Sequence, residues 1–291
     1  MLEQVRLRDL GRLVEVLVTL ALAIVVATQL WQTGWHAFAP LALAGPLFWL
    51  VFALDYLHGP VLAWFILRRR LPINRTAAAP ILGREALNAL LIPYSGDALL
   101  YRWARGAGFA PGKVFAVLKD SAIASALAGS LVTLALVIPL QEKLGSALGL
   151  SPTVLALSLA ALCAIPAAAM LVNRALGQPP LADLPFLLTM HMVRAIANTG
   201  LIALMWALLL PEIPLATWLL LAAARAAVAR LPFVAQKDLA LAALTLVLLP
   251  GAEQVAAVTA LTGGLLTLTH GLVWLWSAYG SRAMARPAAA R

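Results

Sequence analysis

Residues 81–105 read ILGREALNALLIPYSGDALLYRWAR, an apolar segment that Pro93 interrupts before either part is long enough to cross a bilayer. Proline ends the incoming helix, Gly96 permits a tight turn, and Asp97 is suited to cap the amides of an outgoing helix. A second apolar stretch is interrupted in the same way at Pro232. Non-helical backbone is tolerated within a membrane only against protein or water. We therefore expect two broken, re-entrant helical hairpins whose turns face one another inside the protein.

Long apolar runs dominate the rest of the chain. Of its 291 residues, 63% are hydrophobic and 11% are charged, too few charges to wet the surface of a soluble domain. A helix of roughly 18 or more apolar residues can cross the hydrocarbon core. Such runs cover residues 13–30, 41–67, 114–140, 154–172, 185–210 and 254–279. We predict an all-α polytopic membrane protein, a single transmembrane domain over residues 1–291, with about six full transmembrane helices plus the two hairpins.

The net charge of +9 is concentrated beside particular spans. Arginines precede the first apolar run, follow the second and close the chain, whereas the loops expected on the opposite side offer only Lys143. This bias predicts a multi-pass protein of the inner membrane with both termini in the cytoplasm, and it explains the basic excess without nucleic acid. One hairpin must then enter from each side, so residues 12–140 and 153–279 form an inverted repeat in which Arg84 falls opposite Arg225.

Several short motifs resemble those of a known family. They are Leu87-Asn88, Pro93 to Asp97, Arg102 and Lys119-Asp120 in the first half, and Leu231-Pro232, Lys237-Asp238 and Pro250-Gly251 in the second. Together they resemble the signatures of the lysylphosphatidylglycerol synthase transmembrane (flippase-like) superfamily, although the second signature here lacks its usual glycine-rich stretch. The resemblance implies a stand-alone, lipid-translocating membrane domain without the aminoacyl-transferring synthase domain, which would follow residue 291.

Charged groups inside the spans are the candidates for function. An ionisable side chain at the bilayer centre costs about 2.5 kcal/mol or more. The N-terminal end of a half-helix, together with nearby cations, can hold an anionic phosphate. The candidate substrate-binding residues are Arg84, Asn88, Asp97, Arg102, Lys119, Asp120, Arg225, Lys237 and Asp238, of which Asn88 and Arg102 enter through the family resemblance.

Some of these charges also have a purely structural interpretation. Arg84 and Glu85 would pair outward to other segments, because adjacent helical residues do not face each other. A buried Asp120 needs a cation or hydrogen-bond donors, and is open to a proton-coupling role. His191 and Arg194 share one helix face near the start of their span, where we expect an interfacial anchor. Glu253 and His270 are likewise expected to be interfacial or packing residues.

No metal or other cofactor is expected. Asp55 and His58 provide only two of the three or four ligands that zinc usually takes. The sequence has no nucleotide-binding, zinc-protease or serine-hydrolase fingerprint. The single cysteine, Cys163, excludes an intrachain disulfide.

The predicted function is that of a lipid flippase or transporter rather than an enzyme. A polar or anionic head group would cross through a central cavity between the two hairpins. Its expected partners are the lipid substrate, the bilayer, and either a second copy of the chain or a biosynthetic protein. One alternative is a membrane-embedded enzyme acting on a lipid head group, with Asp97 and Asp120 as acid and base. The other is a non-catalytic subunit of a lipid or polyisoprenoid biosynthetic complex.

Overall fold

The computed structural model describes residues 44–91, 94–140, 151–175, 183–228 and 253–284, together with Ile24, Trp31, Leu41, Leu241 and Thr245. These ranges are helical apart from their connecting turns and contain no strand, which confirms the predicted all-α class. Some predicted features lie outside the described residues: most of the first span at 13–30, the turn residue Pro93, and the second interruption with Pro232, Lys237 and Asp238.

Four helices in the described part of the chain are long and apolar enough to cross a membrane. They are α2 (Pro46–Arg70), α5 (Pro111–Val137), α8 (Leu184–Leu209) and the segment Gln254–Ala278 of α11 (Glu253–Met284). Each coincides closely with one of the predicted apolar runs, and the helix α7 (Pro152–Ala175) covers a fifth run. A short 3-10 turn, η3 (Ile138–Leu140), continues α5. The chain is therefore a membrane protein with transmembrane helices, as predicted.

The ends of α2 follow from its sequence. Pro46 stands in the first turn, where its missing amide hydrogen costs nothing and its fixed φ already suits a helix. Arg68, Arg69 and Arg70 form the last turn, next to the negative end of the helix dipole. The guanidinium of Arg68 lies 4.8 Å from the centre of the Trp64 ring, which is typical of a cation–π contact. The helix thus ends in a basic, aromatic turn that suits a membrane–water interface.

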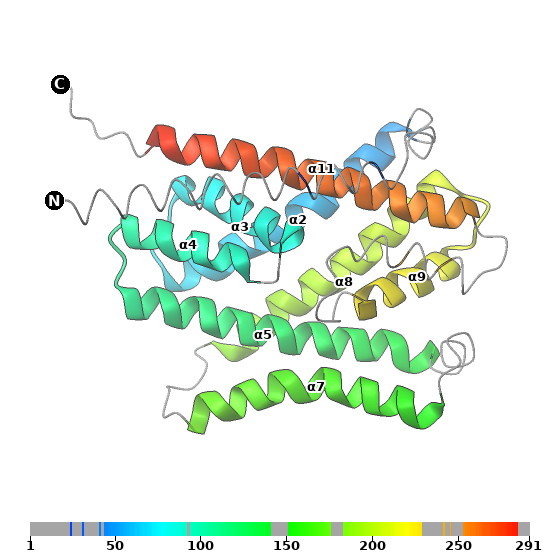
Figure 1. Ribbon diagram of the computed structural model, residues 1–291, viewed down its shortest axis with the longest axis horizontal. Helices are drawn as coiled ribbons and strands as arrows, with labels where there is room; N and C mark the ends of the chain where they lie inside the picture. The colour runs from blue at the N-terminus through cyan, green and yellow to red at the C-terminus, as the bar shows by residue number, and fades with distance from the viewer. Residues whose placement is uncertain are drawn as a thin grey trace.

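The chain around the predicted first interruption forms two short helices. A 3-10 turn, η2 (Arg75–Ala77), leads into α3 (Ala78–Leu90), and after a turn the chain continues as α4 (Ser95–Gly106), which packs against α3. The Ser95 hydroxyl donates a hydrogen bond to the carbonyl oxygen of Leu87 at 3.0 Å and so ties the start of α4 to the end of α3. Figure 1 shows α4 running back toward the end of the molecule at which α5 begins.

The turn itself differs from the predicted one in two residues. Tyr94, not Asp97, occupies the N-cap position of α4, in the left-handed region at φ 70°. The Gly96 amide donates to the side-chain oxygen of Asn88 at 2.7 Å, so Asn88 supplies the capping acceptor from the neighbouring helix. Gly96 serves a close approach rather than a turn, because a Cβ atom there would collide with the backbone of Arg84.

A second short helix, α9 (Leu215–Val228), reaches the centre from the other end of the molecule. Near one end of α11, the Ser277 hydroxyl donates to the carbonyl oxygen of Ala79 at 2.7 Å, and α3 runs from there toward the middle. Near the opposite end of α11, Trp218 of α9 belongs to the same apolar cluster as Val255. Figure 1 shows α3 and α9 pointing inward from opposite ends. This opposed arrangement is what the predicted inverted repeat would require of these two helices.

Two apolar clusters occupy the two ends of the bundle. One joins Phe48 of α2 to Trp206 and Trp218, and the Trp206 indole donates to the Thr262 hydroxyl at 2.7 Å. The other contains Leu67, from the far end of α2, with residues of α3, α4 and α5. The stretch of α2 between the two clusters carries polar residues. Two smaller clusters lie elsewhere in the core, and along α2 a polar region separates the two end clusters.

Candidate functional site

A cavity of about 380 Å³ lies within this polar region. Its wall is formed by α2, α3, α5, α8, α9 and α11, and in each of α2, α5, α8 and α11 the lining residues come from the central part of the helix. The polar lining residues are Asp55, Tyr56, His58, Glu85, Asn88, Ser125, Thr133, His191, Arg194, Asn198, Thr199, Arg225 and His270. Because the four span candidates share this cavity at mid-length, a bilayer that all four cross would place the cavity near the centre of its hydrocarbon core.

One side of the cavity carries a chain of ion pairs. Glu85, which is 9% exposed, accepts a hydrogen bond from Arg194 at 2.6 Å and another from its neighbour Arg84 at 2.9 Å. Arg84 in turn donates to Asp97 at 2.5 Å. Arg84 and Glu85 thus pair outward, with Asp97 and Arg194, as expected, and they also pair with each other. Two cations and two anions alternate along this chain, so it has no net charge.

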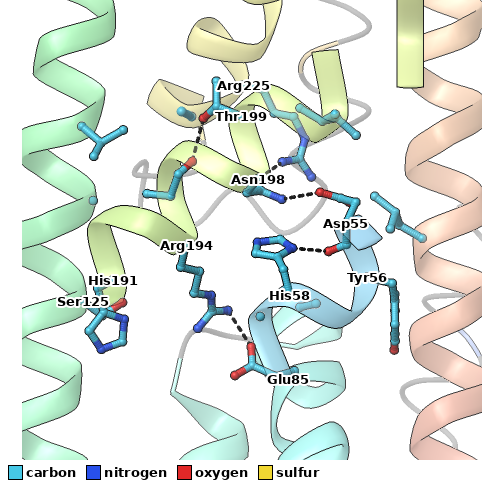
Figure 2. Close-up of a pocket in the computed structure, with 18 of the residues that line it drawn as sticks. Asp55, Tyr56, His58, Glu85, Ser125, His191, Arg194, Asn198, Thr199 and Arg225 are labelled. Carbon is cyan, nitrogen blue, oxygen red and sulfur yellow. Dashed lines mark hydrogen bonds and ion pairs between the residues drawn. The ribbon is translucent and has the colours of Figure 1, made fainter. Parts of the chain in front are cut away.

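On the opposite side of the cavity, the side-chain amide of Asn198 joins an arginine to an aspartate. Arg225, near the end of α9, donates to the side-chain oxygen of Asn198 at 3.3 Å. The nitrogen of the same amide donates to the carboxylate of Asp55 at 3.2 Å. Asn198 thereby links the short helix α9 to α2 through α8. Figure 2 shows this group above His58 and the Arg194–Glu85 pair below it.

All three histidines in the described part of the chain, His58, His191 and His270, line the cavity. His58 Nδ1 lies 2.6 Å from the carbonyl oxygen of Asp55 and must carry a hydrogen, because a carbonyl oxygen only accepts. His191 Nε2 lies 3.1 Å from the Ser121 hydroxyl, and His270 Nδ1 lies 3.2 Å from the Tyr56 hydroxyl. His58 Nε2 and His191 Nδ1 are buried and have no hydrogen-bond partner among the described residues.

The predicted substrate-binding residues fall into several groups. Asn88 and Arg225 line the cavity. Arg84 lies one contact behind it, through Glu85, and Asp97 lies two contacts behind it, through Arg84. Arg102 is exposed on α4 and is not among the lining residues. The positions of Lys237 and Asp238 are outside the described residues, so their predicted role remains a prediction.

Lys119 and Asp120 belong to a separate polar cluster. Asp120 is 3% exposed and accepts from Arg70 at 2.7 Å, and Lys119 Nζ lies 3.6 Å from its other oxygen. Lys119 also donates to the side-chain oxygen of Asn173 at 2.6 Å. The buried aspartate thus has the cation that burial requires. The cluster joins α2, α5 and α7, and none of its residues lines the cavity.

Several residues of the site were given other roles by the sequence. Arg194 was expected at the membrane interface but lines the cavity and binds Glu85, and His191, 4% exposed, is buried in the same wall. His270 also lines the cavity, where its ring packs beside Tyr56 with the ring centroids 5.0 Å apart. The signal that could have found Arg194 is its position in the middle third of an apolar helix, with Asn198 one turn further on the same face.

The fold and the cavity together define a class: an all-α membrane protein with a charged, hydrogen-bonding cavity lined by its transmembrane helices and two short helices. Comparison with protein-family models, curated proteins and solved structures finds no match to this chain. Within the described ranges no three histidine, cysteine or acidic side chains are grouped as a metal site would require. The function has to be argued from the cavity itself.

Proposed function

We propose that this chain is a flippase-type lipid transporter of the inner membrane, in which a polar or anionic head group crosses through the central cavity while the acyl tails stay in the hydrocarbon. The proposal includes about six full spans, two re-entrant hairpins in an inverted repeat, both termini in the cytoplasm, and membership of the flippase-like superfamily that the sequence resembles. The observation that carries it is a charged cavity at mid-length of four apolar helices.

The placement of the charges supports this function over a structural one. Burying a charge in the hydrocarbon is unfavourable, and ion pairs that only stabilise the fold could be replaced by apolar packing at little cost. Here a cavity large enough for a small ligand adjoins Glu85, Arg194, Asp55 and Arg225. Space beside charged groups at this depth is what a head group in transit would use.

The two short helices support the transport geometry. Glu85 and Asn88 come from the inner half of α3, and Arg225 comes from the inner half of α9. Short helices that enter a bundle from opposite sides and end at its centre are typical of sites in transporters. In this proposal Arg194 and Arg225 contact the head group, and Arg84 positions Glu85.

The arrangement gives less support to an enzyme that uses Asp97 and Asp120 as acid and base. Asp97 is bound to Arg84 on the α3–α4 hairpin, whereas Asp120 is bound to Arg70 in the cluster shared with α7. The two carboxylates belong to separate networks, and neither lines the cavity. They have no common site at which a substrate would meet both.

Transport in proteoliposomes tests the proposal. The purified chain is reconstituted with a trace of acyl-labelled fluorescent phospholipid, and the label that becomes accessible to an external quencher reports translocation. Arg225→Gln and Arg194→Gln should each slow translocation at least about tenfold, the effect of losing one charge-assisted hydrogen bond. Arg69→Gln is the matched control, because Arg69 binds Asp183 away from the cavity.

The controls decide how the result is read. All variants should be compared at equal amounts of folded, reconstituted protein, with empty vesicles as the background. Wild-type protein that leaves translocation at the background rate would refute the transport function. Wild-type activity that neither cavity variant lowers would show that lipid moves by another route than this cavity.

A further inference from the structure

Among the described residues, the charges that surround the cavity are balanced. Its wall holds two carboxylates, Asp55 and Glu85, and two guanidinium groups, Arg194 and Arg225. The pair immediately behind it, Arg84 and Asp97, also sums to zero. A site built for a purely anionic ligand would carry an excess of cations, as helix ends and arginine clusters for phosphate do. This cavity carries none among the described residues.

This charge balance restricts which ligands can bind without reducing the number of ion pairs in the cavity. An anionic phosphate that binds Arg194 competes with Glu85, which now holds that guanidinium at 2.6 Å. A purely anionic head group would leave the displaced carboxylate with fewer partners in a buried site, which is unfavourable. A zwitterionic head group instead brings its own cation for the carboxylate. The number of ion pairs is then the same before and after binding.

His58 in the cavity wall places a second, independent requirement on the ligand. His58 uses Nδ1–H for the carbonyl oxygen of Asp55, so in the neutral ring Nε2 is an acceptor. Nε2 is buried and has no partner among the described residues. A buried acceptor without a donor is unfavourable, and a ligand that supplies an N–H or O–H group there gains affinity. A primary ammonium supplies this hydrogen, whereas a quaternary ammonium has none.

Resting on the proposed transport function, we infer that the cavity selects a zwitterionic head group in which a phosphate lies next to a primary ammonium. The phosphate binds Arg194 and Arg225. The ammonium takes the place of a guanidinium beside Glu85 and Asp55 and donates a hydrogen bond to His58 Nε2. Selection therefore has two parts, net charge and the presence of an N–H donor, and they can be measured separately.

Binding to the purified full-length chain tests the inference without relying on transport. The shift in the thermal unfolding midpoint is titrated with phosphatidylethanolamine, phosphatidylcholine and phosphatidylglycerol of one short acyl length, and with free phosphoethanolamine. Phosphatidylethanolamine should bind about tenfold more tightly than phosphatidylcholine, the effect of one hydrogen bond, and more tightly than phosphatidylglycerol. A response to free phosphoethanolamine as strong as the response to the lipid would assign the site to a soluble ligand and overturn the lipid assignment.

Two substitutions of one residue separate selection from folding. His58→Phe keeps an aromatic ring of similar size but removes the acceptor, and should bring the binding of phosphatidylethanolamine down to that of phosphatidylcholine. His58→Gln restores a side-chain acceptor and should recover part of the preference. Asp183→Asn, at the surface pair with Arg69, is the control and should keep the wild-type preference.

Each outcome counts for or against the inference. Phosphatidylglycerol that binds as tightly as phosphatidylethanolamine overturns it, as does the absence of any lipid-induced shift. A preference that His58→Phe leaves intact overturns the role of that ring. Selective binding of phosphatidylethanolamine without translocation in vesicles would support the inference and refute the proposed transport.

Discussion

Glu85→Gln is the substitution that most directly probes the ion-pair chain. The carboxylate accepts two charge-assisted hydrogen bonds, at 2.6 Å from Arg194 and 2.9 Å from Arg84. Each such bond contributes about 1.5–3 kcal/mol. Arg84 keeps Asp97 as its partner, and the Arg194 side chain is 31% exposed, so part of the loss is recovered. We expect the free energy of unfolding to fall by about 3 kcal/mol, near the lower end for a broken buried pair.

The measurement is reversible unfolding of the full chain in mixed micelles, followed by tryptophan fluorescence. A loss of about 3 kcal/mol raises the unfolding equilibrium constant roughly a hundredfold. A double-mutant cycle with Arg194→Gln should show a coupling energy of about 1 kcal/mol or more, because the two side chains touch. Asp183→Asn provides a surface comparison. A loss below about 1 kcal/mol for Glu85→Gln, or no coupling to Arg194, would refute the view that this carboxylate holds the cavity wall together.

Two further predictions concern the hairpin and the surface. Gly96→Ala should lower the free energy of unfolding by about 1–3 kcal/mol, because the new Cβ atom meets the backbone of Arg84. Gly112→Ala is the control and should not lower it, because its Cβ atom meets no atom within 4 Å. Equal stability of the two variants in the same unfolding assay would contradict the close approach at Gly96. The hydrogen bond from Arg69 holds the pKa of the Asp183 carboxyl below its ordinary value of 3.8, so its stabilising contribution is present above pH 3.8 and is lost as the pH falls through the lower, folded value. The stability difference between wild type and Asp183→Asn should therefore shrink on acidification through this range, and a difference that grows would show the opposite sign of linkage.

Four long apolar helices and the break between α3 and α4 could be predicted because their signals are local. Hydrocarbon thickness fixes how many apolar residues a crossing helix needs, so α2, α5, α8 and α11 followed from run length alone. Pro93 marked the break between α3 and α4 because proline lacks the amide that a helix requires. The capping role of Asn88 was missed because Asn88 lies on the preceding helix, α3, and accepts from the Gly96 amide across the hairpin.

The cavity could be predicted only in part because its contacts join distant segments. Glu85 and Arg194 are separated by 109 positions in the sequence, and Asp55 and Asn198 by 143. Asn88 and Arg225 were found because they lie near helix interruptions, where motif and repeat arguments apply. No motif or interruption in the sequence points to His58. Its proposed role in ligand selection depends on the carbonyl oxygen of Asp55, which fixes the tautomer of the ring.

The apolar clusters along α2 bear on leakage through the bundle. Phe48 belongs to one cluster with Trp206 and Trp218, and Leu67, toward the other end of α2, belongs to another. A dry apolar constriction blocks the passage of water and ions. In the proposed transport cycle, at least one of these two clusters would have to stay closed at every moment, so that a head group can cross without opening a continuous path for ions.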